Sequence, residues 1–216
     1  MTDEIKIVEP VVKKKRVNSK KKGSGFEGHI GKVLGEHLPP MKFRRSQSSG
    51  AILGGVNQRF MKHYSDDAMA LFIGDVVPTN EADVSRDLGW KLKFTLECKF
   101  YKTADNIEHL LSNTKIRRWF EQACTDAAKL SKEPLLIFKF NHTEIFAACN
   151  TDTIGTLPAN LTRSLSFFYA AEGDLPERRF TVFHLKEALL DIPWWKTFQA
   201  LPLTTDNRET YELQKS

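Results

Sequence analysis

Two apolar segments that read as β-strands each carry charged side chains, and this combination most constrains the fold of the chain. Asp75 lies within LFIGDVV, and Glu97 and Lys99 lie within LKFTLECKF. Alternate side chains of a strand lie on the same face, so Glu97 and Lys99 must share a face while Cys98 points to the other. Two carboxylates and one ammonium on a shared surface suit a divalent metal ion and the water that it activates.

A simple hairpin would bring these groups together. The predicted strands, residues 70–78 and 92–101, are separated by the polar, turn-like segment NEADVSRDLG. Paired residue numbers in an antiparallel hairpin have a constant sum, and pairing residues 75 and 97 centres the turn on residue 86, inside that segment. The sequence therefore predicts that Asp75 lies opposite Glu97.

The other apolar patterns predict a mixed α/β protein. Helical spacing predicts helices over residues 26–38 and 114–131. A close approach to backbone or ligand would explain three glycines in the first helix, and the tryptophan pair near the C-terminus is expected to complete the core. Further predicted elements are a short strand at 41–45, a short helix at 57–64, and strands at PLLIFKF, EIFAAC and RFTVFHL, the first two of these three forming a hairpin. This order predicts a mixed central sheet flanked by helices.

The positive charge of the chain is concentrated near its start. Of the 32 Lys/Arg and 27 Asp/Glu, residues 1–25 hold eight and three, which leaves 24 of each sign elsewhere. A flexible basic arm adds salt-sensitive affinity for a polyanion such as nucleic acid, although a solubilising tail or a nuclear-import signal would also explain it. The basic residues in question are Lys13, Lys14, Lys15, Arg16, Lys20, Lys21 and Lys22. The predicted boundaries are a disordered arm over residues 1–24, one domain over 25–200 and a tail over 201–216.

Composition and motif searches exclude several other classes of protein. No apolar run approaches the roughly 18 residues of a membrane span, and the N-terminus lacks a signal-peptide core, so we expect a cytoplasmic protein. Three cysteines without metal-ligand spacing and six histidines without an HExxH or HxH cluster argue against zinc. Gly31-Lys32 lacks the rest of a P-loop, and no GxSxG motif is present.

Each candidate residue on the two strands also has a structural explanation. Asp75 lies where its strand leaves the apolar run, and a lone Asp there commonly caps a turn. Glu97 belongs to an alternating polar series that a solvated strand face would explain without any chemistry. That series comprises Lys91, Lys93, Thr95, Glu97 and Lys99.

The candidates outside the two strands have similar alternatives. Ser24 and Glu27 fit the S-x-x-E capping box of a helix N-terminus, and Gln122 occupies what would normally be a solvated helix position. The polar loop after the first helix has hydroxyl and guanidinium groups that would hold phosphates, or it is simply a polar surface loop. Its residues are Arg44, Arg45, Ser46, Ser48 and Ser49.

Glu27, then Asp75, then Glu97-x-Lys99 resemble the PD-(D/E)xK nuclease superfamily in order and in their predicted elements. The intervening RRSQSSG and the Glu-Cys-Lys triplet are similar to those of archaeal-type Holliday junction resolvases, and residues 25–140 also resemble nucleases encoded by bacteriophages. Gly74 stands where the family has a Pro, and the gap before Glu97 is longer than usual.

The resemblance implies a restriction-endonuclease-like αβββαβ core and a metal-dependent endonuclease that hydrolyses DNA. The implied substrate is branched DNA, most specifically a four-way junction in recombination, cut by a homodimer in a bacterial or phage-infected cell. Two alternatives stay open. One is a recombination, repair or restriction-like nuclease acting on duplex or flap DNA, and the other is a DNA-binding protein that keeps the fold without catalysis.

The resemblance also assigns roles to the site residues. Asp75, Glu97 and the backbone carbonyl of Cys98 would bind Mg²⁺ or Mn²⁺, which suit hard oxygen ligands. Glu27 would bind a second metal ion or contact the first through water, and Lys99 would orient the attacking water. Gln122 is expected to support this site. Four residues later, however, Asp126 stands where an aromatic residue is often found.

Overall fold

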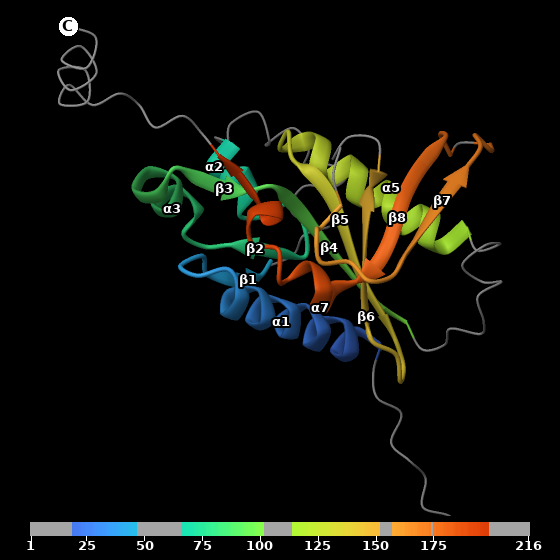
Figure 1. Ribbon diagram of the computed structural model, residues 1–216, viewed down its shortest axis with the longest axis horizontal. Helices are drawn as coiled ribbons and strands as arrows, with labels where there is room; N and C mark the ends of the chain where they lie inside the picture. The colour runs from blue at the N-terminus through green and yellow to red at the C-terminus, as the bar shows by residue number, and fades with distance from the viewer. Residues whose placement is uncertain (1–18, 47–65, 102–113, 152–156, 174, 199–216) are drawn as a thin grey trace, which may run out of the picture.

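The computed structural model describes residues 19–46, 66–101, 114–151, 157–173 and 175–198 (Figure 1). Its elements are α1 Ser19–His37, β1 Phe43–Arg45, α2 Asp66–Ala70, β2 Val76–Pro78, α3 Glu81–Leu88, β3 Trp90–Leu92, β4 Phe94–Tyr101, α5 Thr114–Lys129, β5 Glu133–Phe140, β6 Ile145–Asn150, β7 Ser164–Tyr169, β8 Arg178–His184, α7 Leu185–Ala188, the 3₁₀ turn η2 Pro193–Trp195, and β9 Lys196–Phe198. The predicted helix at 57–64 and the predicted tail at 201–216 lie outside the described residues.

A mixed sheet of seven strands forms the centre of the fold, in the order β1-β2-β4-β5-β6-β8-β7 (Figure 1). β4 and β5 are parallel, and the other neighbouring strands of this sheet are antiparallel. A parallel pair needs a crossover connection, and α5 supplies it. The series α1-β1-β2-β4-α5-β5 therefore confirms the expected αβββαβ core, and β5 and β6 form the predicted hairpin.

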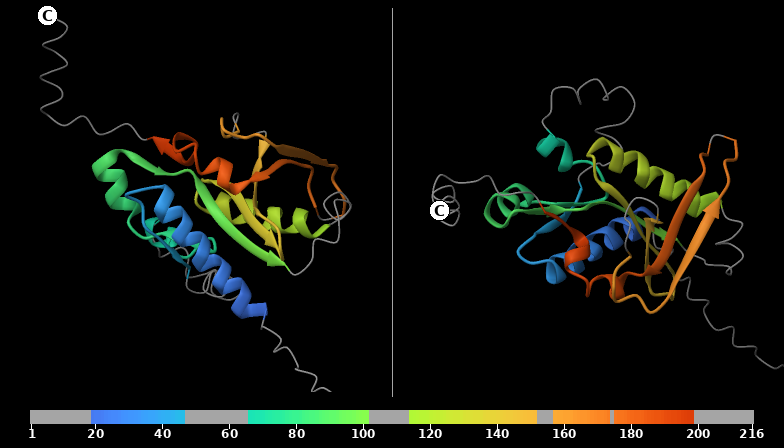
Figure 2. Two further views of the ribbon diagram at one scale, coloured as in Figure 1. Left: turned by 60° about the horizontal axis from the view of Figure 1, so that its bottom comes forward. Right: turned by 45° about the horizontal axis from the view of Figure 1, so that its top comes forward.

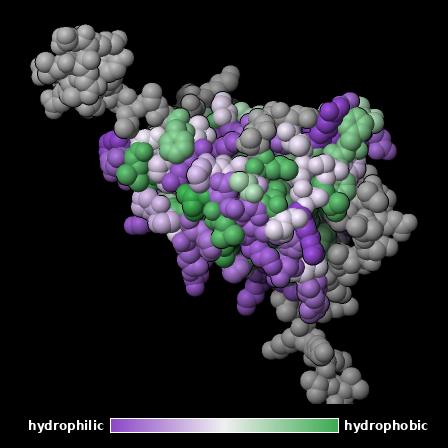
Figure 3. Space-filling view, viewed as in Figure 1, coloured by the Kyte–Doolittle hydropathy of each residue, from purple (hydrophilic) through white to green (hydrophobic). Residues whose placement is uncertain are grey.

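The two long helices cover opposite faces of the sheet (Figure 2). Ile30 and Leu34 of α1 belong to the same buried cluster as Leu96. On the other face, Phe120 of α5 packs in a second cluster with Phe138. The outward side of α1 is mostly hydrophilic (Figure 3), as expected for a helix that buries only one stripe.

The register of β2 and β4 is the one predicted from the sequence. Val76 pairs with Leu96, which keeps the index sum that places residue 75 opposite residue 97. The connection between the strands is longer and more ordered than predicted, because NEADVSRDLG forms α3 instead of a turn. Val84 is buried on the inner side of this helix, and Gly89 ends it with a left-handed φ of 67°.

Two further predictions were wrong at their boundaries. The strand expected over residues 70–78 is reduced to Val76–Pro78, because α2 ends at Ala70 and turns follow it. Residues 19–24 of the expected disordered arm belong to α1. Helix packing outweighs the poor helix propensity of the GSG segment here: Lys22 lies 3.5 Å from the Asn141 side chain and over the Phe100 ring.

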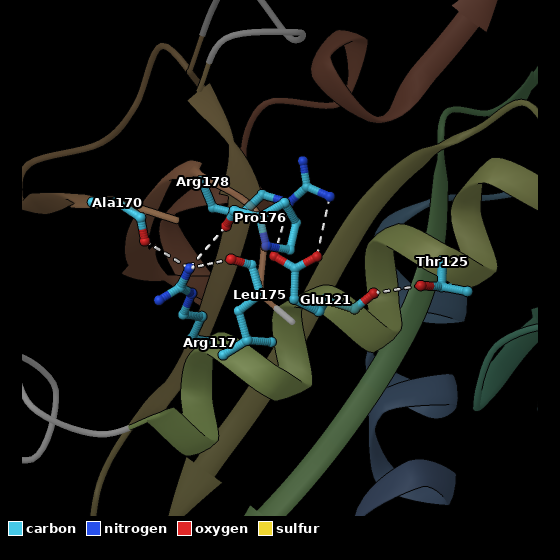
Figure 4. A network of polar contacts seen from close by, with 7 residues as sticks. All are labelled: Arg117, Glu121, Thr125, Ala170, Leu175, Pro176 and Arg178. Carbon is cyan, nitrogen blue, oxygen red and sulfur yellow. Dashed lines mark hydrogen bonds and ion pairs between the residues drawn. The ribbon is translucent and has the colours of Figure 1, made fainter. Parts of the chain in front are cut away.

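The β7–β8 hairpin is attached to α5 by two arginines (Figure 4). The Arg117 side chain is 3% exposed, and one of its guanidinium nitrogens lies 2.8–3.1 Å from three backbone carbonyl oxygens of the hairpin. Arg178 of β8 donates to both carboxylate oxygens of Glu121 on α5. The three carbonyls are those of Ala170, Leu175 and Pro176. The C-terminal third of the chain thus adds β8 and β7 to the central sheet, and their hairpin is held against α5.

The tryptophan pair near the C-terminus is part of the core, as predicted. Trp195 is fully buried, and the Trp194 ring lies 4.4 Å from the Phe94 ring, centroid to centroid. The strand that follows them, β9, pairs with β3 to form a small second sheet. No helix in the described ranges is long and apolar enough to cross a membrane.

Candidate active site

Asp75 is fixed by three backbone contacts at the start of β2. Its amide donates to the Leu96 carbonyl at 2.8 Å, and its own carbonyl accepts from the Ser46 amide at 2.8 Å. Its carboxylate oxygen Oδ2 accepts from the Cys98 amide at 2.9 Å. β2 begins at Val76, so no residue of β2 pairs with Cys98. The Asp75 carboxylate accepts from the Cys98 amide in place of a strand partner. The carboxylate therefore lies against the middle of β4.

Gly74 allows this approach. Its φ is +93°, and a Cβ at this position would lie 2.9 Å from the Leu96 carbonyl oxygen. Side chains rarely adopt this φ, and proline is locked near −65°. The backbone path therefore requires glycine at position 74, where the resemblance led us to expect proline. The sequence alone did not reveal this requirement.

Substituting Gly74 is expected to damage the site. Gly74→Ala should lower the free energy of unfolding by about 1–3 kcal/mol and displace Asp75, because both the backbone angle and the contact with Leu96 are strained. Urea unfolding measures the first effect, and metal-dependent cleavage at a temperature where the variant is folded measures the second. The matched control is Gly28→Ala on α1, where a Cβ meets nothing within 4 Å and helix stability should rise. Equal behaviour of the two variants would contradict the assignment.

Glu97 and Lys99 share the face of β4 that is covered by α5, and Cys98 points to the α1 side, as strand alternation predicts. Glu97 pairs in register with Leu136, which packs in the α5 cluster, whereas Cys98 belongs to the α1 cluster. Glu97 is only 2% exposed and forms an ion pair with Lys99. The solvated-face explanation is therefore wrong for Glu97.

The buried carboxylate of Glu97 is hard to ionise in this setting. Burial, reinforced by the neighbouring Asp75 charge, raises its pKa to about 8, and the attraction of Lys99 only partly offsets this. Burial alone would lower the pKa of Lys99, but the Glu97 carboxylate and the Asp75 charge raise it above its ordinary value. Two carboxylates close together with one ammonium thus form a site that further positive charge would stabilise.

The donor set of this site fits a hard divalent cation. Asp75 and Glu97 offer carboxylate oxygens, and the backbone carbonyl of Cys98 lies on the strand between Glu97 and Lys99. Within the described ranges, no three Asp, Glu, His or Cys side chains gather as a ready metal-binding group. Mg²⁺ nevertheless keeps several waters and commonly uses only one or two carboxylates, so two carboxylates and a carbonyl are sufficient.

Glu27 lies on α1, and its immediate partner is Arg45. Its Oε2 accepts from the Arg45 Nε at 2.5 Å, and its side chain is 19% exposed. The Glu27 charge also contributes to raising the pKa of the Cys98 thiol, after burial and the charges of Asp75 and Glu97. The capping-box explanation is wrong, because α1 begins at Ser19 and the Ser24 hydroxyl donates to the Lys21 carbonyl inside the helix.

On α5, Gln122 and Asp126 differ in their relation to the site, and the sequence noted Asp126 only as a departure from the expected pattern. Gln122 is exposed, one helical turn before Asp126. The Asp126 carboxylate accepts from Lys129 at 2.6 Å, and its charge is near enough to add to the raised pKa of Glu97. Asp126 is therefore a third acidic group near the site.

The candidate phosphate-binding residues separate into two kinds. Arg44 and Lys21 are exposed, whereas Ser46 is buried and its hydroxyl donates to the Phe72 carbonyl at 3.3 Å. Ser46 thus holds the backbone before β2 and does not present its hydroxyl to solvent. Two further described candidates have protein partners: Arg45 pairs with Glu27, and Lys22 lies near Asn141. The others, Lys13, Lys14, Lys15, Arg16, Ser48 and Ser49, lie outside the described residues, and the side chain of Lys20 is likewise not described.

Comparison with protein families gives a match over most of the chain. A family model described as "Phage putative PDDEXK endonuclease" matches residues 18–188, which include both long helices and the seven strands of the central sheet. No curated protein and no solved structure matches the chain.

Proposed function

Because the chain belongs to the phage PDDEXK endonuclease family, we propose that it hydrolyses DNA phosphodiester bonds with the help of a divalent metal ion. The observation that supports this most directly is the convergence of Asp75, Glu97 and Lys99. Asp75 reaches β4 through the Cys98 amide, and Glu97 is buried beside it and paired with Lys99. A purely structural site would have little reason to bury a carboxylate next to a second one.

Mg²⁺ or Mn²⁺ would be held by Asp75, Glu97 and the Cys98 carbonyl. When bound there, the cation would polarise the scissile phosphate and lower the pKa of the attacking water. The raised pKa of Glu97 supports this role, since the carboxylate needs more positive charge than Lys99 supplies. In this proposal Glu27 serves a second metal ion or acts through water, after its pairing with Arg45 is relaxed.

Lys99 is suited to act on the reacting groups directly. Its side chain is 25% exposed while Glu97 is 2% exposed, so the ammonium lies where the buried site meets solvent. From this position it would orient the attacking water and offset the charge that develops on the phosphate oxygens. Gln122, exposed on the same covering helix, would contact DNA and not the metal ion.

The basic residues would supply affinity for the DNA backbone. Lys21, Lys22 and Arg44 are described parts of this surface, and Lys13 to Arg16 and Lys20 would extend it along the N-terminal arm. Such contacts depend on salt and not on base sequence. Binding should therefore weaken steeply between low and moderate ionic strength.

We further propose branched DNA, and specifically a four-way junction, as the substrate. This choice rests on the sequence resemblance of Glu27 and the RRSQSSG segment to junction resolvases. Resolving a junction requires cuts in two opposed strands, and a symmetric homodimer would place two equivalent sites across the branch point.

Cleavage assays on three DNA structures test the proposal. A four-way junction, a flap and a linear duplex of matched sequence are each incubated with Mg²⁺ or with chelator. We expect paired, chelator-sensitive cuts on the junction. Cleavage of flap or duplex with equal efficiency would replace the resolvase assignment by a repair or restriction-like nuclease. Tight binding without cleavage of any substrate would overturn catalysis altogether.

A further inference from the structure

The C-terminal end of β4 and the first turns of α5 carry an aromatic and basic cluster that the proposed chemistry does not use. Tyr101 is 41% exposed, and its ring centroid lies 5.9 Å from that of Trp119. The Lys115 ammonium lies 4.3 Å from the centroid of the Tyr101 ring and donates to its hydroxyl at 2.6 Å. These three residues, Tyr101, Lys115 and Trp119, are called the aromatic platform below.

The aromatic platform is aligned with the candidate active site. Tyr101, Lys99 and Glu97 are alternate residues of one strand, so all three side chains lie on the face covered by α5. Four residues of strand separate Tyr101 from Glu97, or roughly 13 Å. A DNA strand that runs along β4 from a phosphate beside Lys99 would therefore pass Tyr101 within a few nucleotides of the cut.

The charges around the platform are those that a nucleic acid requires. Lys115 lies on the α5 side of β4, and Lys22 lies over the neighbouring Phe100 ring on the other side. The contact between Lys115 and Tyr101 is exposed, so it is weak and easily exchanged for a phosphate. Trp119 is fixed from behind because it packs against the α5 cluster. An exposed aromatic ring beside a packed one, with a lysine next to them, is an arrangement on which a nucleobase can stack.

We propose that the aromatic platform binds an unpaired nucleobase of DNA beside the scissile phosphate. A base inside a duplex has both faces covered by its neighbours, whereas an unpaired base offers a free face to Tyr101 or Trp119. The protein would then favour DNA with an unpaired or unstacked nucleotide near the cut. This inference deepens the proposed function, on which it rests for the position of the scissile phosphate.

Binding measurements in chelator test the platform without requiring cleavage. The probes are a fluorescent duplex and the same duplex with one unpaired adenine, and fluorescence anisotropy gives both affinities. We expect the intact protein to bind the bulged DNA about tenfold more tightly. Tyr101→Ala should remove this preference and leave duplex affinity unchanged, whereas Tyr101→Phe should retain it. Equal affinities in the intact protein, or an equal loss on both probes in Tyr101→Ala, would overturn the proposal.

A matched control and a second readout make the result specific. Phe168 on β7 is also an exposed aromatic residue beneath a cation, with the Arg179 guanidinium 5.1 Å from its ring, but it lies at the far edge of the sheet. Phe168→Ala should leave the preference intact. The other three tryptophans are buried, so quenching of tryptophan fluorescence by the bulged DNA should disappear in Trp119→Phe. Quenching that persists would show that the base does not reach the platform.

The two proposals fail separately in these experiments. Metal-dependent cleavage without a preference for the unpaired base would leave the nuclease function standing and remove the platform. A preference for the unpaired base that depends on Tyr101, in a protein that cuts no DNA, would support the aromatic platform and overturn the nuclease function.

Discussion

Lys99→Ala is expected to abolish metal-dependent cleavage and to leave DNA affinity nearly unchanged. The ammonium is the one group of the site that is both paired with the buried Glu97 and open to solvent. Removing a cation that stabilises developing charge typically costs about 10²–10³-fold in rate. Single-turnover cleavage with Mg²⁺ measures the loss, and DNA binding in chelator measures the affinity.

Lys139→Ala is a suitable control for this variant. Lys139 lies on the adjacent strand β5, paired with Phe100, and its removal deletes the same charge from the neighbouring strand. Cleavage by this control should change little beyond any small effect on binding. If Lys99→Ala loses DNA binding together with cleavage, Lys99 has a structural role, and the catalytic assignment is wrong.

Glu97→Gln is expected to abolish cleavage while making the metal-free protein more stable at high pH. The raised pKa of Glu97 means that the folded state keeps a proton that the unfolded state has already lost. Stability therefore falls as pH rises from about 4.5, and the penalty is complete above about 8. Glutamine does not titrate, so the variant should escape a penalty on the order of a few kcal/mol.

Thermal unfolding in chelator at pH 5 and pH 9 measures this difference. The variant should unfold several degrees above the wild type at pH 9, and the gap should shrink at pH 5. Added Mg²⁺ should raise the wild-type midpoint at pH 9 and not that of the variant, because the ionised carboxylate is then a ligand. Glu36→Gln, an exposed change on α1, should show none of these effects. A wild type whose stability does not fall with pH relative to Glu97→Gln would contradict the burial argument.

The predicted site geometry followed from short-range rules that a single sequence obeys. The period of a strand placed Glu97 and Lys99 on one face, and the hairpin index sum gave the observed register of Val76 with Leu96. The α5 helix was predicted from its apolar stripe, because a strong 3.6-residue period has few alternative explanations.

The errors arose where tertiary contacts outweighed local composition. NEADVSRDLG has the composition of a turn, yet it forms α3. Val84 is buried on the inner side of this helix, and Glu81 accepts from the Leu92 amide and pairs with Lys132. The predicted start of α1 is too late for a similar reason. The GSG segment has poor helix propensity, and the residues that Lys22 contacts, Asn141 and Phe100, lie far away in sequence. Neither set of partners is visible in the local pattern.

The sequence by itself determined which side chains share a face, because alternation along a strand is fixed by the covalent geometry of the backbone. Only the tertiary structure decided that the Asp75 carboxylate reaches the Cys98 amide across strands, that Gly74 must lack a side chain, and that α5 seals Glu97 from water. Those outcomes depend on distances between elements, and such distances are set by packing across the whole sheet.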